Sequence, residues 1–135
     1  MTARRKARKK ALDLLFEADL RSADAVELLK MRPADELSES PYVTTLVTGV
    51  WEHVAKIDEL IHAYAQDWDI DRMPAIDRNL LRIALFEILW LPDLDDRIAI
   101  NEAIEIAQDL STSDSAGFIN GVLGRIVALK SVITL

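Results

Sequence analysis

The chain has 135 residues, half of them apolar and only four each proline and glycine, so it can bury a hydrophobic core and is not disordered. The absence of cysteine excludes disulfide bonds, thiolate catalysis and cysteine-ligated zinc. No apolar run approaches the ~18 residues of a membrane span, and acidic residues interrupt the segment after the basic N-terminus, unlike a signal peptide. We therefore expect a cytoplasmic protein, away from membranes, with one domain over residues 1–135.

The net charge of −7 conceals a strong asymmetry. Residues 1–10 carry +6 and residues 11–135 carry −13. A basic arm on an acidic body is typical of proteins that bind a phosphate backbone. The alternative is a solvated terminus that only aids solubility. The cations of the arm are Arg4, Arg5, Lys6, Arg8, Lys9 and Lys10.

The first helix is expected over residues 4–21 and has two apolar faces. One stripe contains four small or apolar residues, which are Ala7, Ala11, Leu14 and Ala18. On nearly the opposite side, Leu12, Phe16 and Leu20 follow an i, i+4, i+8 spacing and form a second ridge. A helix with two apolar faces buries both or leaves one for a partner.

The next segments predict a short helix, a loop and a long helical stretch. Residues 23–31 form the short helix, and residues 32–40 are expected to be a loop. The pair Ser40-Pro41 is a good helix start, and the periodic pattern then continues to about Trp68. We expect this stretch to break near residues 49–54 into two helices.

Three further helices are expected in the C-terminal half. Residues 75–90 are strongly apolar, and residues 97–110 have the clearest amphipathic pattern. A loop over residues 111–117 precedes a last helix over residues 118–133, which is apolar nearly all round and is therefore expected to be central. Two glycines in that helix, Gly121 and Gly124, indicate close approach of a neighbour. Since no segment alternates like a strand, the prediction is an all-α fold of about seven helices.

Catalytic and metal-binding patterns are missing from the sequence. His53 and His62 are nine residues apart and do not share a helix face as an i, i+4 metal pair does. Asp67, Asp69 and Asp71 imitate a calcium loop, but its sixth position is arginine instead of glycine. Phosphate-binding loops and nucleophile elbows are also absent. We predict no enzyme activity, no metal and no cofactor.

Four segments taken in order resemble the family of the bacterial transcription antitermination factor NusB. They are RRKARKKALDLLFEADL, LVTGV, AIDRNLLRIALFEIL and IAINEAIEIAQDLSTSDSAGFINGVLGRI, between Arg4 and about Val127. The resemblance implies two packed three-helix bundles that bind single-stranded boxA RNA together with the ribosomal protein NusE. It also implies assembly with other Nus factors on RNA polymerase, which suppresses premature termination in ribosomal RNA operons. Some members form homodimers.

The resemblance also assigns residues to two surfaces. The RNA surface contains the six arm cations together with Asp114 and Phe118, and the NusE surface contains Phe16 and Asp77, to which the ridge adds Leu12 and Leu20. Asp114 also suits a helix N-cap, a role compatible with RNA contact, and Phe118 is alternatively a core residue. Asn101 and Asn120 are expected to be buried amides between helices.

Three positions depart from the family pattern. Gly117 stands where a basic residue is common, Gly124 where Asp or Asn is common, and Phe16 where tyrosine is usual. Two other functions remain open on the sequence. One is a helical protein–protein adaptor, and the other is a detached NusB-like module of a ribosomal RNA methyltransferase.

Overall fold

The computed structural model describes residues 2–65 and 68–135, and these residues form helices and connecting turns without a strand. None of the described helices is both long and apolar enough to cross a membrane. The α-helices are α1 Ala3–Arg21, α2 Ala25–Lys30, α3 Ala34–Glu39, α4 Pro41–Tyr64, α5 Ala75–Trp90, α6 Asp96–Leu110 and α7 Ser113–Ala128. Two short 3-10 helices, Ile70–Arg72 and Lys130–Val132, precede α5 and follow α7. The predicted all-α class with seven helices is therefore confirmed.

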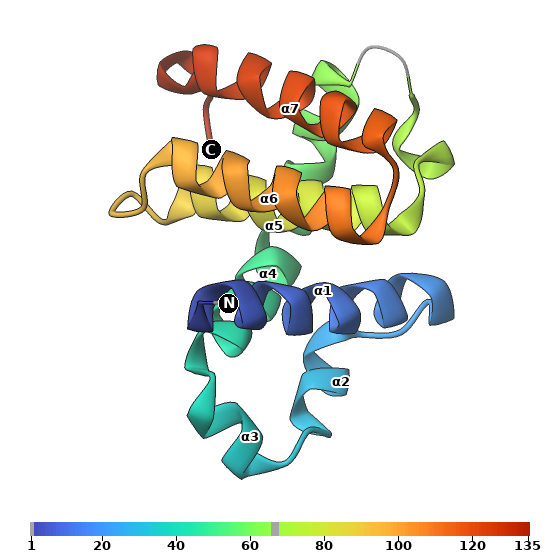
Figure 1. Cartoon of the computed structure of the whole chain (residues 1–135), viewed down its shortest axis with the longest axis vertical. Coiled ribbons are helices and arrows are strands. Elements are labelled where there is room, and N and C mark those ends of the chain that lie inside the picture. The colour runs from blue at the N-terminus through green and yellow to red at the C-terminus, as the bar shows by residue number, and fades with distance from the viewer. Residues whose placement is uncertain (1, 66–67) are drawn as a thin grey trace.

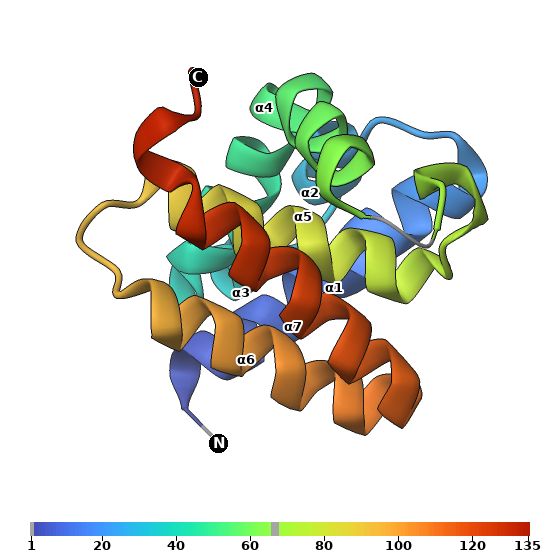
Figure 2. The ribbon, with the colours of Figure 1, turned by 90° about the horizontal axis from the view of Figure 1, so that it is seen from above.

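The helices form two packed groups (Figure 1). Helices α1, α2 and α3 lie together around the first half of α4, and α5, α6 and α7 form the other group. At 24 residues and 1.5 Å per residue, α4 is about 36 Å long, enough to pack against both groups. Seen from above, α7 lies over α5 and beside α6 (Figure 2).

Helix α5 is the centre of the core. Ten of its 16 residues are buried, and it packs against α1, α4, α6 and α7. The prediction that the last helix is central is wrong, because α7 buries one side only and leaves Gly117 and Gly124 exposed. The apolar residues of α7 that face α5 and α6 satisfy the pattern without a central position.

Gly49 does not break α4, which runs continuously through residues 49–54. A Cβ atom built at Gly49 would lie 2.1 Å from Cζ of Phe86, so the glycine lets the aromatic ring of α5 lie directly on the backbone of α4. By contrast, Gly124 has open space around it and does not mark a close approach.

Three other local expectations also needed correction. The expected loop over residues 32–40 contains helix α3. Helix α7 begins five residues before Phe118, because Thr112 caps it by accepting from the backbone N–H of Ser115 at 3.1 Å. Asn101 and Asn120 are exposed, and the buried amide of the described chain is Asn79 on α5.

Candidate nucleic-acid interface

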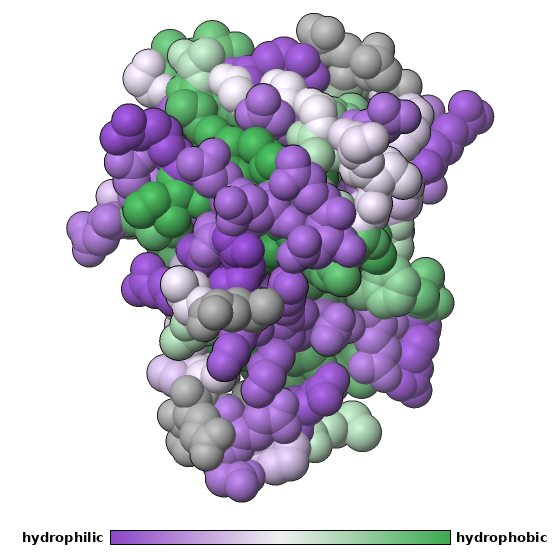
Figure 3. All heavy atoms as spheres, viewed as in Figure 1, coloured by the Kyte–Doolittle hydropathy of each residue, from purple (hydrophilic) through white to green (hydrophobic). Residues whose placement is uncertain are grey.

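The basic arm is part of helix α1, whose first two turns contain all six cations. Thr2 is the N-cap, and its hydroxyl accepts from the backbone N–H of Arg5 at 3.0 Å. Since successive helix residues turn by about 100°, the cations are distributed over several faces and meet different surroundings. Figure 3 shows hydrophilic side chains across the middle of the molecule, where α1 meets α6.

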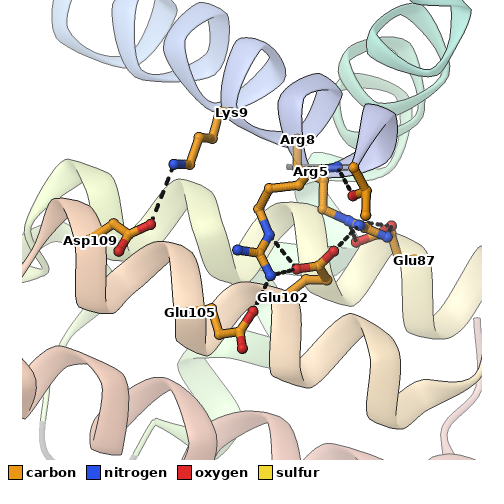
Figure 4. A network of polar contacts seen from close by, with 8 residues as sticks. Arg5, Arg8, Lys9, Glu87, Glu102, Glu105 and Asp109 are labelled. Carbon is orange, nitrogen blue, oxygen red and sulfur yellow. Dashed lines mark hydrogen bonds and ion pairs between the residues drawn. The ribbon is translucent and has the colours of Figure 1, made fainter.

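Part of the arm faces a row of carboxylates on α6 (Figure 4). Glu102, Glu105 and Asp109 follow an i, i+3, i+7 spacing, which aligns them on one side of the helix. Arg5 forms ion pairs with both glutamates, and Nζ of Lys9 lies 3.4 Å from Asp109 Oδ2. We call these three acidic residues the α6 carboxylate row.

The hydrogen bond to Glu102 raises the pKa of the Arg5 guanidinium, so Arg5 stays charged. Lys10 points elsewhere, with its Nζ 3.6 Å from Glu36 Oε1 on α3. The arm is thus neutralised in part by the protein itself.

Arg8 is buried instead of facing solvent. Its Nη2 donates to Glu87 Oε2 at 2.7 Å, its Nε to the same oxygen at 3.0 Å, and its Nη1 to Glu102 Oε1 at 2.9 Å. The hydroxyl of Tyr42 on α4 also donates to Glu87. We call Arg8, Glu87 and Tyr42 the buried ionic cluster, and it joins α1, α4 and α5.

Within the buried ionic cluster, the Arg8 side chain stays positively charged and the Tyr42 hydroxyl stays neutral. Burial acts to lower the pKa of Arg8, but its hydrogen bonds to Glu87 outweigh this and the pKa rises. Burial and the hydrogen bond to Glu87 together raise the pKa of the Tyr42 hydroxyl far above its ordinary value. The expectation that Arg8 presents its charge to solvent is wrong, because its side chain is only 3% exposed.

Arg4 and Lys6 differ from the other arm cations. Both are exposed, and within the described residues neither has a carboxylate partner. The guanidinium carbon of Arg4 lies 4.6 Å from the centre of the Tyr42 ring, a cation–π contact. These two cations are the most available to an anionic ligand.

Asp114 and Phe118 lie in the first turns of α7, a helix that packs against α6 on the side away from α1 (Figure 1). Asp114 is exposed and is not the N-cap, a position that Thr112 occupies. Phe118 is half-buried, and its ring centre lies 5.2 Å from that of Trp68, which is 41% exposed. The arm and the aromatic pair therefore flank α6 from opposite sides.

The second ridge of α1 is only partly on the surface. Leu20 is 64% exposed and Phe16 is half-buried, but Leu12 is in the core. Asp77, in the first turn of α5, is fully buried and accepts from the Ser111 hydroxyl at 2.9 Å. The expectation of an exposed surface that includes Leu12 and Asp77 is wrong, since helix packing covers both side chains.

Sequence reasoning missed the carboxylates that bind the arm. Glu87 lies in the last turn of the apolar helix α5 and is buried there, where a charge is stable only with a buried partner. An acidic residue within so apolar a helix was the sequence signal that could have predicted an ion pair with a cation from another helix. No group of acidic and histidine side chains in the described residues is arranged to hold a metal ion. Asp67, in the rejected calcium pattern, lies outside the described residues.

Comparisons with known proteins match nearly the whole chain to one family. A sequence profile of the NusB family matches residues 5–128. The transcription antitermination protein NusB of Salinispora arenicola is 52% identical over 134 residues, covering 93% of this chain and 96% of the relative. The protein of the same name from Acidothermus cellulolyticus is 48% identical over 135 residues, covering 99% of this chain and 93% of the relative.

Solved structures give the same result. NusB of T. maritima superposes with a TM-score of 0.85 at 32% identity, covering 95% of this chain and 92% of that one. A chain of a complex described as antitermination factors NusB and NusE with double-stranded RNA superposes with a TM-score of 0.76 at 25% identity, covering 95% and 98%.

Proposed function

The chain belongs to the NusB family, and from this membership we infer that it is a transcription antitermination factor and not an enzyme. It binds the boxA RNA of ribosomal RNA operon transcripts as a complex with NusE. In the cytoplasm this complex joins other Nus factors on RNA polymerase and suppresses premature termination. The observation that carries the proposal is the identity of about half of all residues with proteins named for antitermination.

The proposed RNA surface begins at the arm. Arg4 and Lys6 make the first phosphate contacts, because they are exposed and have no carboxylate partner among the described residues. Arg5, Lys9 and Lys10 contribute after exchanging their carboxylates for phosphates. Arg8 acts through the fold, since its charge is bound to Glu87.

The surface continues across α6 to α7. The half-buried ring of Phe118 offers a face on which a splayed base stacks. The exposed carboxylate of Asp114 accepts hydrogen bonds from exocyclic amino groups of bases. This arrangement supports a path for single-stranded RNA over α6, from the arm to the start of α7.

The proposed NusE surface consists of Phe16 and Leu20, the part of the second ridge that solvent reaches. Leu20 is among the most exposed large apolar side chains of the described chain. The charge of −13 over residues 11–135 favours rapid association with a basic ribosomal protein. Leu12 and Asp77 are buried and are left out of this contact surface.

Fluorescence anisotropy of a labelled boxA RNA, with a scrambled RNA as control, tests the proposal. The protein is titrated with and without NusE. We expect tighter binding to boxA than to the scramble, and a further gain when NusE is present. Equal binding to both RNAs in both conditions would leave a helical protein–protein adaptor and contradict the proposed function.

A further inference from the structure

A cleft of about 280 Å³ lies beside the N-terminal end of the arm. Arg4 of α1, Tyr42 and Thr45 of α4, and residues 91–94 of the loop between α5 and α6 line it. Of its lining residues only Arg4 belongs to a surface assigned above, and the rest of the cleft lies outside both the RNA and the NusE surface. Its position next to an unpaired arm cation raises the question of which ligand fits it.

One wall of the cleft is a cation on an aromatic ring. The ring of Tyr42 is held in place because its hydroxyl donates to the buried Glu87. Arg4 lies over that ring, with 4.6 Å from its guanidinium carbon to the ring centre. The guanidinium carbon of Arg8 also lies over the ring, at 5.7 Å from its centre, so the surface offered to a flat ligand is the planar guanidinium of Arg4, which stacks on heterocycles.

The remaining walls combine apolar and polar groups. Leu91, Pro92 and Leu94 supply apolar surface, while Thr45 and Asp93 add a hydroxyl and a carboxylate. Binding sites for small molecules have this composition, and the volume is just below their usual range of about 300–1,000 Å³. The cleft suits one small heterocycle that hydrogen-bonds through its edge.

Charge selects the class of ligand. Arg4 has no carboxylate partner among the described residues, so it is free to pair with a phosphate attached to the heterocycle. A nucleotide combines a heterocycle with a phosphate, and the basic arm supplies further phosphate contacts along a chain of nucleotides.

We propose that this cleft is a nucleobase subsite for single-stranded RNA, in which one base stacks against the Arg4–Tyr42 pair while the arm holds its backbone. The inference rests on the proposed function, because it requires RNA at the arm. It extends the RNA surface to α4 and to the loop after α5, on the other side of the arm from Phe118.

Two variants on neighbouring positions of α4 test this subsite. Thr45 and Thr44 are both exposed, but only Thr45 lines the cleft. Thr45→Met extends a longer uncharged side chain into the cleft, and Thr44→Met makes the same change outside it. Both are assayed with NusE against intact boxA RNA and against a series in which each base in turn is replaced by an abasic nucleotide.

For the unmodified protein we expect one abasic position near one end of the bound segment to weaken binding about 10-fold, the usual effect of losing one stacked base. Thr45→Met should weaken binding to intact RNA by a similar factor and lose its sensitivity at that position. Thr44→Met should behave like the unmodified protein. Circular dichroism confirms that both variants fold.

The experiment distinguishes a failure of the subsite from a failure of the proposed function. If Thr45→Met retains the full loss at every sensitive abasic position, the subsite is refuted while the proposed function stands. If the unmodified protein does not bind intact boxA RNA, with or without NusE, the proposed function fails and the subsite with it.

Discussion

Arg8 and Lys9 are neighbours in the sequence and both face a carboxylate, yet their ion pairs differ in kind. The side chains of Arg8 and Glu87 are 3% and 1% exposed, whereas those of Lys9 and Asp109 are 26% and 56% exposed. The first pair joins α1 to α5 in the interior, and the second joins α1 to α6 at the surface. One basic segment therefore contributes both to the core and to the proposed RNA surface.

The surroundings of the two pairs determine what each can do. A buried ion pair is difficult to replace, because losing one partner leaves the other charge without water or counter-charge. An exposed pair contributes about 0–1 kcal/mol and exchanges easily with another anion. The comparison predicts that changes in the buried ionic cluster affect stability, while changes at the α6 carboxylate row affect ligand binding.

The largest effect is expected for Glu87→Ala. This substitution leaves Arg8 buried with only the Glu102 contact and removes the acceptor of the Tyr42 hydroxyl. We expect the free energy of unfolding to fall by about 3–5 kcal/mol, measured by urea denaturation.

The double variant Arg8→Met with Glu87→Leu is the matched control. It replaces both charges by apolar side chains of similar volume, so we expect it to be more stable than Glu87→Ala. A loss below about 1 kcal/mol for Glu87→Ala would contradict the description of Arg8 as a residue bound in the interior.

The second effect concerns the unpaired cations. Arg4→Ala combined with Lys6→Ala should weaken RNA binding roughly 10-fold and reduce the salt slope by about 1.4, at ~0.7 for each lost phosphate contact. The free energy of unfolding should stay nearly unchanged, because neither side chain is buried. Anisotropy titrations at several salt concentrations measure this.

Lys30→Ala combined with Lys56→Ala removes the same charge from α2 and α4, away from the arm, and serves as control. If this control flattens the salt slope equally, the arm has no special role in holding RNA.

Much of the fold was predictable from the sequence, because periodicity and caps are local signals. The bounds of α1, α5 and α6 agree with the helices expected over residues 4–21, 75–90 and 97–110 within one residue at each end. The predictions were wrong where the role of a residue depends on a contact with a residue far away in the sequence. Gly49 resembled a helix break because the Phe86 ring that requires it is far away in sequence.

The site was less predictable for the same reason. Charge counting located the arm but treated its six cations as equivalent. Which of them reach solvent depends on Glu87 and Glu102, which are 79 and 94 residues from Arg8. A single sequence shows which residues are acidic and which are basic, but it does not show which of them form ion pairs. The roles of Phe16, Leu20, Asp114 and Phe118 stay predictions.

The third effect is a dependence on alkaline pH. Because the native pKa of Tyr42 is raised, the unfolded chain loses this proton near pH 10 while the native protein retains it. The contribution of Tyr42 to the free energy of unfolding is therefore fully present below about pH 10 and declines as the pH rises.

Tyr42→Phe tests this dependence. The variant lacks the hydrogen bond to Glu87 at neutral pH, so it should be less stable there. The difference from the unmodified protein should shrink by about 1 kcal/mol between pH 9 and 11 in urea denaturation. A difference independent of pH would mean that Tyr42 ionises in the native protein as easily as in the unfolded chain.

The smallest effect tests whether the α6 carboxylate row competes with RNA. Glu105→Gln combined with Asp109→Asn removes the two exposed members and releases Arg5 and Lys9 in part. We expect RNA affinity to rise about 2- to 3-fold and stability to change by less than about 0.5 kcal/mol. Glu27→Gln with Glu59→Gln is the control, since it neutralises two carboxylates on α2 and α4 that are also more than half exposed. An equal gain in the control would assign the effect to net charge. Weaker binding in the test variant would mean that the row positions the arm for RNA instead of competing for it.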